Sequence, residues 1–391
     1  TQAYVRFVTQ LLRDQALGPR VVPILVDEAR TFGMEGLFRQ IGIYNPEGQK
    51  YTPVDKDQVM YYREDKAGQI LQEGINEAGG MSSWIAAATS YSTSNRIMVP
   101  FYVYYSMFGF QRIGDLAWAA GDMQARGFLL GGTSGRTTLN GEGLQHEDGH
   151  SHILANTIPN CVTYDPTFAH EVGVILHHGL QRMVERQENV YYYITLLNEN
   201  YAMAGLVPGT EEQIIKGMYL CKPGAADTQA PRVQLLGSGS ILRESFVAQE
   251  LLAADWGVQA DVWSCPSFNE LTRDGQDVER WNLLHPLEVP RVPFVAQQLA
   301  DHAGPVVTST DYMKAYGEQI RPFLPAGRPY KVLGPDGFRR KLREHFEIDR
   351  HYIVVAALKA LSEDGKVPVQ LVADAIAKYG IQTDRINPLH A

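Results

Sequence analysis

The strongest constraint on the fold of this 391-residue chain is an alternation of short β-branched or aromatic runs with longer helical patterns. Short apolar runs bounded by turn residues predict strands, whereas apolar residues recurring every three or four positions predict helices. Such alternation is typical of a mostly parallel sheet with helices on both faces, so we predict an α/β fold. The predicted strands are 21–26, 98–105, 128–133, 161–165, 190–196, RVQLLG, ADVWSC and PVVTST.

Helices are predicted between these strands. One begins at the N-terminus, with Tyr4, Val5, Val8, Leu11 and Leu12 on one side. Asp165-Pro166 predicts a helix start, with aspartate as N-cap and proline at the first position. The predicted helices are 69–78, 84–91, 112–127, 165–186, one ending at Gly257, and two near the C-terminus.

Residues 202–231 interrupt this rhythm because they are rich in Gly, Ala and Pro. We interpret them as a linker region. The sequence therefore predicts two α/β domains, one covering about 1–207 and the other 208–391. The chain has no starting Met and opens directly into a helical pattern, which we interpret as a fragment or a cut at a domain boundary.

Composition argues against several classes of protein. The net charge of −9 disfavours a nucleic-acid partner, because nucleic-acid affinity depends mostly on Lys and Arg meeting phosphate. No apolar run reaches the roughly 18 residues that span a bilayer, so no membrane association is expected. The three cysteines follow no CxxC spacing and predict free thiols in a reducing cytoplasm.

The string HEDGH, from His146 to His150, matches the H-E-x-x-H signature of zinc peptidases. That signature requires a helix, but Gly149 interrupts the string and its approach is rich in glycine. We therefore predict a loop without zinc. Glu171 is a candidate for a third zinc ligand, but nothing in the sequence marks it. Two interpretations stay open: histidines hydrogen-bonded in an ordered loop, and a non-metal active site. The glycine-rich GSGSILR and GGTSGRT strings match neither a dinucleotide loop nor a Walker loop.

Carboxylates mark two further candidate positions. Asp27 and Glu28 follow the first predicted strand, and open α/β sheets bind ligands at such strand ends. Glu77 is expected late in the helix 69–78, facing inward beside Ile75, where burial would raise its pKa. Solvated carboxylates remain the alternative at both positions.

Four longer strings, at 27–44, 72–79, 104–116 and 131–152, together resemble the homodimeric, bacterial-type pyruvate dehydrogenase. This family is the thiamine-diphosphate-dependent decarboxylating component of the pyruvate dehydrogenase complex. The resemblance covers essentially the whole chain. It implies a middle, pyrimidine-binding domain followed by a transketolase-like C-terminal domain, and oxidative decarboxylation of pyruvate with reductive acetylation of a lipoyl group.

The resemblance also implies roles for individual residues. Glu77 matches the glutamate that hydrogen-bonds the aminopyrimidine ring, and Phe108 matches the aromatic that stacks on it. His146 matches the active-site histidine near the reacting carbons. The resemblance places the remaining residues in the lining of the same pocket: Tyr105, Asp27, Glu28, Ile75 and Glu142.

The chain departs from the family pattern in two ways. It lacks the Gly-Asp-Gly motif whose domain holds magnesium and the diphosphate, and the stretch after Phe338 is a few residues short. The resemblance implies a homodimer that works with a dihydrolipoyl acetyltransferase whose docking tail lies outside this chain. The resemblance therefore implies that this chain is a fragment that carries half of the cofactor site and is inactive alone. The alternatives are a transketolase-like enzyme on another 2-keto substrate, an inert assembly module and, least favoured, a zinc hydrolase.

Overall fold

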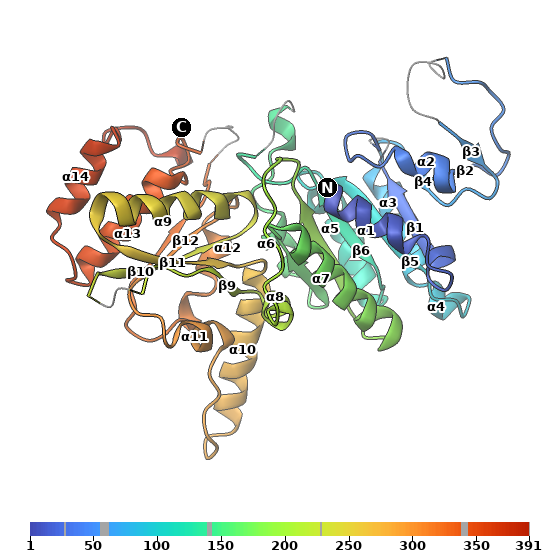
Figure 1. Ribbon diagram of the computed structural model, residues 1–391. Coiled ribbons are helices and arrows are strands. Elements are labelled where there is room, and N and C mark those ends of the chain that lie inside the picture. Colours follow the sequence, from blue (N-terminus) through green and yellow to red (C-terminus); the bar gives the residue numbers. More distant parts are fainter. Residues whose placement is uncertain (27–28, 55–61, 139–142, 227–228, 338–342, 391) are drawn as a thin grey trace. The chain divides into compact units, whose positions relative to one another are not determined.

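The computed structural model describes residues 1–26, 29–54, 62–138, 143–226, 229–337 and 343–390. The chain divides into two compact units, each built around its own sheet (Figure 1). Unit 1 contains residues 1–134, 154–163 and 172–198, and unit 2 contains 135–153, 164–171 and 199–391. Within the described residues, no helix is both long and apolar enough to cross a bilayer.

Unit 1 is built on a six-stranded sheet of order β4-β1-β5-β6-β8-β7. Every pairing from β4 through β8 is parallel. The strands are β1 (Val21–Leu25), β4 (Leu71–Gln72), β5 (Val99–Tyr105), β6 (Phe128–Gly132), β7 (Cys161–Tyr164) and β8 (Tyr191–Leu196), and a separate pair comprises β2 (Ile43–Tyr44) and β3 (Glu64–Asp65). The mostly parallel sheet confirms the predicted α/β class.

Helices cover both faces of this sheet because successive side chains of a strand point to opposite sides. The Phe101 ring on β5 lies 5.9 Å from Tyr4 of α1 (Gln2–Leu11). The next residue, Tyr102, contacts α3 (Glu77–Ala88) on the other face. There α3 packs beside α5 (Gly109–Asp122). The remaining helices of this part of the chain are α2 (Gly36–Ile41), α4 (Ser90–Thr93), α6 (Ser151–Asn156) and α7 (Ala169–Leu180), the last followed by a π-turn at Gln181–Glu185.

Unit 2 has a five-stranded sheet of order β13-β12-β10-β11-β9. It is parallel except for its edge strand β9. Its strands are β9 (Tyr219–Lys222), β10 (Arg232–Gly237), β11 (Gln259–Ser264), β12 (Val306–Ser309) and β13 (Tyr330–Leu333). Its helices are α8 (Glu211–Lys216), α9 (Leu242–Trp256), α10 (Phe268–Leu284), α11 (Phe294–Leu299), α12 (Ala315–Glu318), α13 (Arg350–Glu363) and α14 (Gln370–Lys378).

Two hydrophobic cores flank this second sheet. Leu235 of β10 belongs to the core formed with α9, α13 and α14, whereas the adjacent Leu236 belongs to the core formed with α10, α11 and α12. Both faces of the strands are therefore apolar, which is why they read in the sequence as continuous hydrophobic runs.

Three local predictions were wrong. Residues 69–78 are not a helix: they contain β4 and a turn with Gly74 at φ +71°, and α3 begins only at Glu77. The predicted linker contains α8 and β9, because edge pairing with β11 stabilises a segment without strong local preference. Asp165 is not a helix cap: α7 begins at Ala169, and the Asp165 carboxylate accepts a hydrogen bond from Ser238 Oγ.

Candidate functional site

Glu77 is the first residue of α3, and only 7 % of it is exposed. The preceding residue, Asn76, caps the helix by accepting a 3.1 Å hydrogen bond from the Gly79 N–H. A carboxylate is favoured at this position because helix N-termini present unpaired N–H groups and the positive end of the dipole. Tyr102 donates its hydroxyl to the Glu77 carbonyl oxygen at 3.2 Å. Burial raises the pKa of Tyr102, and the negative charge of Glu77 raises it further, so the phenol stays protonated and remains a donor.

Arg112 connects Glu77 with Phe108. Its Nη1 donates to Glu77 Oε1 at 2.6 Å, and its guanidinium carbon lies 4.1 Å from the centroid of the Phe108 ring. Phe108 immediately precedes α5, and Arg112 follows one helical turn later. A flat, nitrogen-bearing group thus satisfies a buried carboxylate and stacks on an aromatic ring at the same time. A hydrogen bond to a buried carboxylate and stacking on an aromatic ring are also the contacts that a flat nitrogen heterocycle would make.

Tyr105 is the last residue of β5, at the carboxyl-end edge of the parallel sheet. Its ring lies 5.3 Å from Phe32 and 6.3 Å, edge-on, from Phe108. Gly132 at the end of the neighbouring strand β6 makes room for this arrangement, because a Cβ there would lie 2.5 Å from the Phe32 ring. The structure thus brings Glu77, Tyr105 and Phe108 together through α3, β5 and α5 of unit 1.

The other predicted lining residues are not placed in this cluster. Ile75 is 73 % exposed. Asp27, Glu28 and Glu142 lie outside the described residues, as does Phe338. Their assignment to the pocket remains a prediction.

The HEDGH string belongs to unit 2 and has no continuous helix. His146 ends a 3₁₀ turn (Leu144–His146), whereas the α6 helix begins at Ser151, beyond His150. The two histidines therefore do not lie one turn apart on a helix, as a zinc peptidase requires. The described residues contain no group of three or more His, Cys, Asp or Glu suited to a metal ion.

The residues that follow His146 are firmly placed. Asp148 is buried and accepts hydrogen bonds from the backbone N–H groups of His150 and Ser151, both at 3.0 Å. The His152 ring is fully buried, stacked 5.0 Å from Tyr316 and edge-on 4.8 Å from Tyr312. Burial lowers the pKa of His152 to about 3, so this histidine is neutral near pH 7.

Sequence reasoning missed two residues that the geometry singles out. Arg112 stands four positions after Phe108, and this helical spacing would have indicated contact between them. Asp311 follows β12 and accepts hydrogen bonds from Thr137 and Thr138. No local pattern marks Asp311, because its partners lie more than 170 residues away in the sequence.

The arrangement of the two sheets and their helices defines a transketolase-like α/β fold. Similar solved structures include the transketolase of Leishmania mexicana (TM-score 0.66, 13 % identity, covering 94 % of this chain and 46 % of that one). The transketolase of Campylobacter jejuni gives a TM-score of 0.61 at 15 % identity, covering 92 % of this chain and 46 % of that one. At these identities the likeness concerns the fold alone.

The chain belongs to the pyruvate dehydrogenase E1 component family. Residues 1–204 match the model of the pyruvate dehydrogenase E1 component middle domain, and residues 217–349 match that of the transketolase-like C-terminal domain. Pyruvate dehydrogenase E1 components of Pseudomonas aeruginosa and Escherichia coli are each 63 % identical to it over 394 residues, covering 100 % and 99 % of this chain. The chain spans 44 % of the length of these relatives.

Proposed function

We propose that this chain supplies the pyrimidine-binding half of a thiamine diphosphate site in a pyruvate dehydrogenase E1 component. The whole protein would decarboxylate pyruvate and reductively acetylate a lipoyl group. The observation that carries this proposal is the Glu77–Arg112–Phe108 arrangement in a chain of this family. The substrate comes from the names of the relatives.

The residues present fit the pyrimidine ring of the cofactor. Arg112 already presents a flat group with N–H donors to the Glu77 carboxylate and the Phe108 ring. An aminopyrimidine offers the same combination of ring face and ring nitrogen. Stacking on Phe108 would contribute roughly 0.5–1.5 kcal/mol beyond area burial.

When bound, thiamine diphosphate supplies a carbon nucleophile and an electron sink for loss of carbon dioxide. Glu77 would hold a proton at the ring nitrogen of the pyrimidine through its buried carboxylate. Phe108 would orient the ring, and Tyr105 would border the reacting region from the end of β5. His146 would hydrogen-bond the substrate carboxylate or move a proton at the reacting carbons. Asp27, Glu28, Ile75 and Glu142 complete the proposed lining.

The remaining parts of the machinery are proposed to lie outside this chain. Magnesium and the diphosphate would be held by another domain of the longer protein. We also propose a homodimer in the cytoplasm that delivers its product to a dihydrolipoyl acetyltransferase. These assignments rest on the family resemblance.

The test uses the longer polypeptide in which the relatives carry these residues. Glu77→Gln and Glu77→Ala should reduce pyruvate decarboxylation, followed with a dye acceptor, by the ~10²- to 10⁴-fold typical of acid–base groups. Asp115→Asn removes an exposed carboxylate from α5 and should retain normal turnover. Turnover within a few-fold of wild type in both Glu77 variants would refute the assignment.

A further inference from the structure

One short segment after β12 holds both ends of the loop that carries His146. We call residues 135–138 and 143–152 the histidine loop, and Asp311–Tyr316 the anchor segment. Both belong to unit 2. Both ends of the histidine loop contact the anchor segment.

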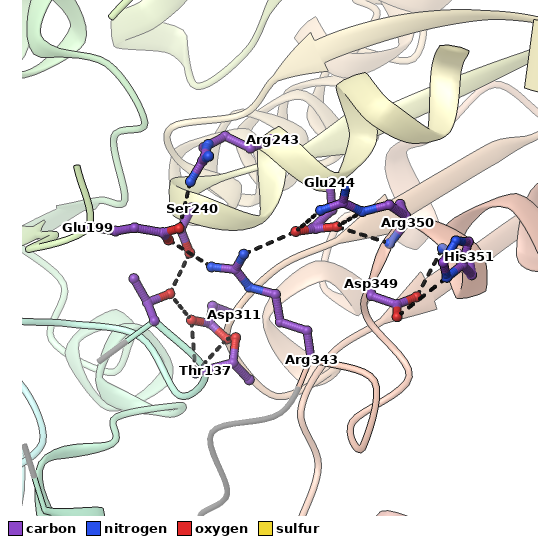
Figure 2. Close-up of polar contacts among 11 residues, drawn as sticks. Thr137, Glu199, Ser240, Arg243, Glu244, Asp311, Arg343, Asp349, Arg350 and His351 are labelled. Atoms are coloured by element: carbon purple, nitrogen blue, oxygen red, sulfur yellow. Dashed lines mark hydrogen bonds and ion pairs between the residues drawn. The ribbon is translucent and has the colours of Figure 1, made fainter. Parts of the chain in front are cut away.

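The first contact is made by Asp311, which is 2 % exposed. Its carboxylate accepts from the Thr137 N–H at 3.0 and 3.1 Å and from Thr137 Oγ1 at 2.7 Å (Figure 2). It also accepts from Thr138 Oγ1 at 2.5 Å. Gly135 permits this close approach: its φ is +101°, and a Cβ there would lie 2.5 Å from Asp311 Oδ2. The loop is therefore built around this side chain.

A carboxylate suits this position because one backbone N–H and two threonine hydroxyls are directed at it. Burial raises the pKa of Asp311, while the hydrogen bonds from Thr138 and Thr137 act in the opposite direction. An asparagine of the same shape presents an NH₂ group in place of one oxygen, so the Thr138 hydroxyl would have to accept instead of donate. The charge-assisted hydrogen bonds to the carboxylate, which are roughly twice as strong as neutral ones, would be lost.

Arginine and glutamate side chains near the anchor segment form a series of ion pairs in which the two charges alternate (Figure 2). Arg343 Nη2 donates to Glu199 at 2.7 Å and its Nη1 donates to Glu244 at 3.0 Å, and the charge of Arg343 also acts on Asp311. Two further arginines end this series of ion pairs: Arg243 pairs with Glu199, and Arg350 pairs with Glu244. Thr138 also shares a hydrogen bond with Ser240, in the 3₁₀ turn (Gly239–Ile241) that precedes α9. The first stem of the loop is thus tied to several elements of unit 2.

The second stem is held by the same anchor segment. The Met313 N–H donates to the Gly149 carbonyl oxygen at 2.9 Å. The His152 ring packs against Tyr312 and Tyr316. His146 lies between these two attachments and is half-buried, directly after the exposed residues 143–145.

We propose that Asp311 is a positioning residue for His146. It fixes the first stem of the histidine loop, while Met313, Tyr312 and Tyr316 fix the second, so that the placement of His146 depends on the anchor segment. The consequence for catalysis rests on the role proposed above for His146. The structural part of the inference is independent of that role.

The first experiment measures hydrogen exchange in the 391-residue chain. Asp311→Asn should speed deuterium uptake in peptides covering residues 143–152 by about tenfold or more, because it weakens the attachment of the first stem. A tenfold change corresponds to a loss of about 1.4 kcal/mol of local stability. Asp261→Asn is the matched control: Asp261 is also 2 % exposed and accepts from Gly224 and Gln234, far from the loop in sequence and contacts. It should leave uptake in 143–152 unchanged.

A milder variant covers the case in which Asp311→Asn does not fold. Thr138→Val removes one hydroxyl donor at nearly constant volume and should speed uptake in the same peptides by a smaller factor. Unchanged uptake in Thr138→Val and Asp311→Asn, or an equal increase in Asp261→Asn, would overturn the anchor.

The second experiment separates this inference from the proposed function. In the longer enzyme, Asp311→Asn should lower kcat about 10- to 100-fold, the cost of a misplaced reacting group, and should shift the limb of the pH–rate profile that His146→Gln abolishes. Asp261→Asn should leave that limb in place. If His146→Gln retains full turnover, the role of His146 is wrong, while the exchange result still decides the anchor. An unshifted limb with normal kcat in Asp311→Asn would overturn the positioning role.

Discussion

At the scale of single residues, His152 makes a pH-dependent contribution to stability. Its folded-state pKa is lowered to about 3 by burial, against an ordinary value of about 6.5. Between these two values the unfolded chain binds a proton that the folded chain does not. The free energy of unfolding should therefore fall as pH falls from about 6.5 toward 3, with a loss of about 2 kcal/mol from His152 by pH 5.

Urea unfolding of the 391-residue chain at pH 7 and pH 5 measures this contribution. His152→Phe is the control, since it keeps a ring beside Tyr312 and Tyr316 but cannot titrate. His178, whose pKa burial lowers to about 4, contributes equally to both proteins. The variant should lose less stability than the wild type over this range. Equal losses would show that His152 does not remain neutral in the fold.

At the scale of elements, α13 depends on its N-cap. The Asp349 side chain accepts from the N–H groups of His351 at 2.9 Å and Tyr352 at 3.1 Å. Because α13 packs on α9 and β12, fraying of its first turn weakens the core. Asp349→Ala should lower the free energy of unfolding by about 1 kcal/mol. Asp364→Ala, at the exposed far end of the same helix, should cost nothing, since a carboxylate there opposes the helix dipole. Equal losses in both variants would argue against the cap.

The elements also show what a sequence can reveal. The buried strands β1, β5, β8 and β10 were predictable because runs such as 190–196 are apolar on both faces. The start of α3 was not, because β4 is held by parallel pairing of Leu71 with Ile24 rather than by its own composition. Strand β9 was not predicted for the same reason, because its partner β11 lies about 40 residues later. Contacts between distant segments, which have no local signature, decided each of these cases.

At the scale of the whole molecule, the candidate site was only partly predictable. The proposed roles of Glu77, Tyr105 and Phe108 follow from the resemblance of the sequence around them to the family. Arg112 and Asp311 work through contacts with those residues or with the histidine loop, so their significance becomes apparent only in the folded chain. Positioning residues are generally of this kind, because they hold other groups in place and do not touch the ligand themselves.

The whole chain should bind thiamine diphosphate weakly. The contacts proposed here are one stacked ring and a few hydrogen bonds, each worth about 0.5–1.5 kcal/mol net. The incoming pyrimidine must also displace or share the Arg112–Glu77 ion pair, which is already formed at 2.6 Å. Set against the several kcal/mol lost on association, these terms leave a dissociation constant of roughly millimolar order.

Calorimetric titration of the 391-residue chain with thiamine diphosphate and magnesium measures this affinity. The Phe108→Ala variant is the control: any heat that comes from the pyrimidine pocket should disappear in it, because the stacking surface is lost. Micromolar binding that survives in Phe108→Ala would mean that the chain holds the diphosphate by itself. The division of the cofactor between this chain and another domain would then be wrong, since most of the affinity of such a ligand comes from charge-assisted contacts to its phosphates.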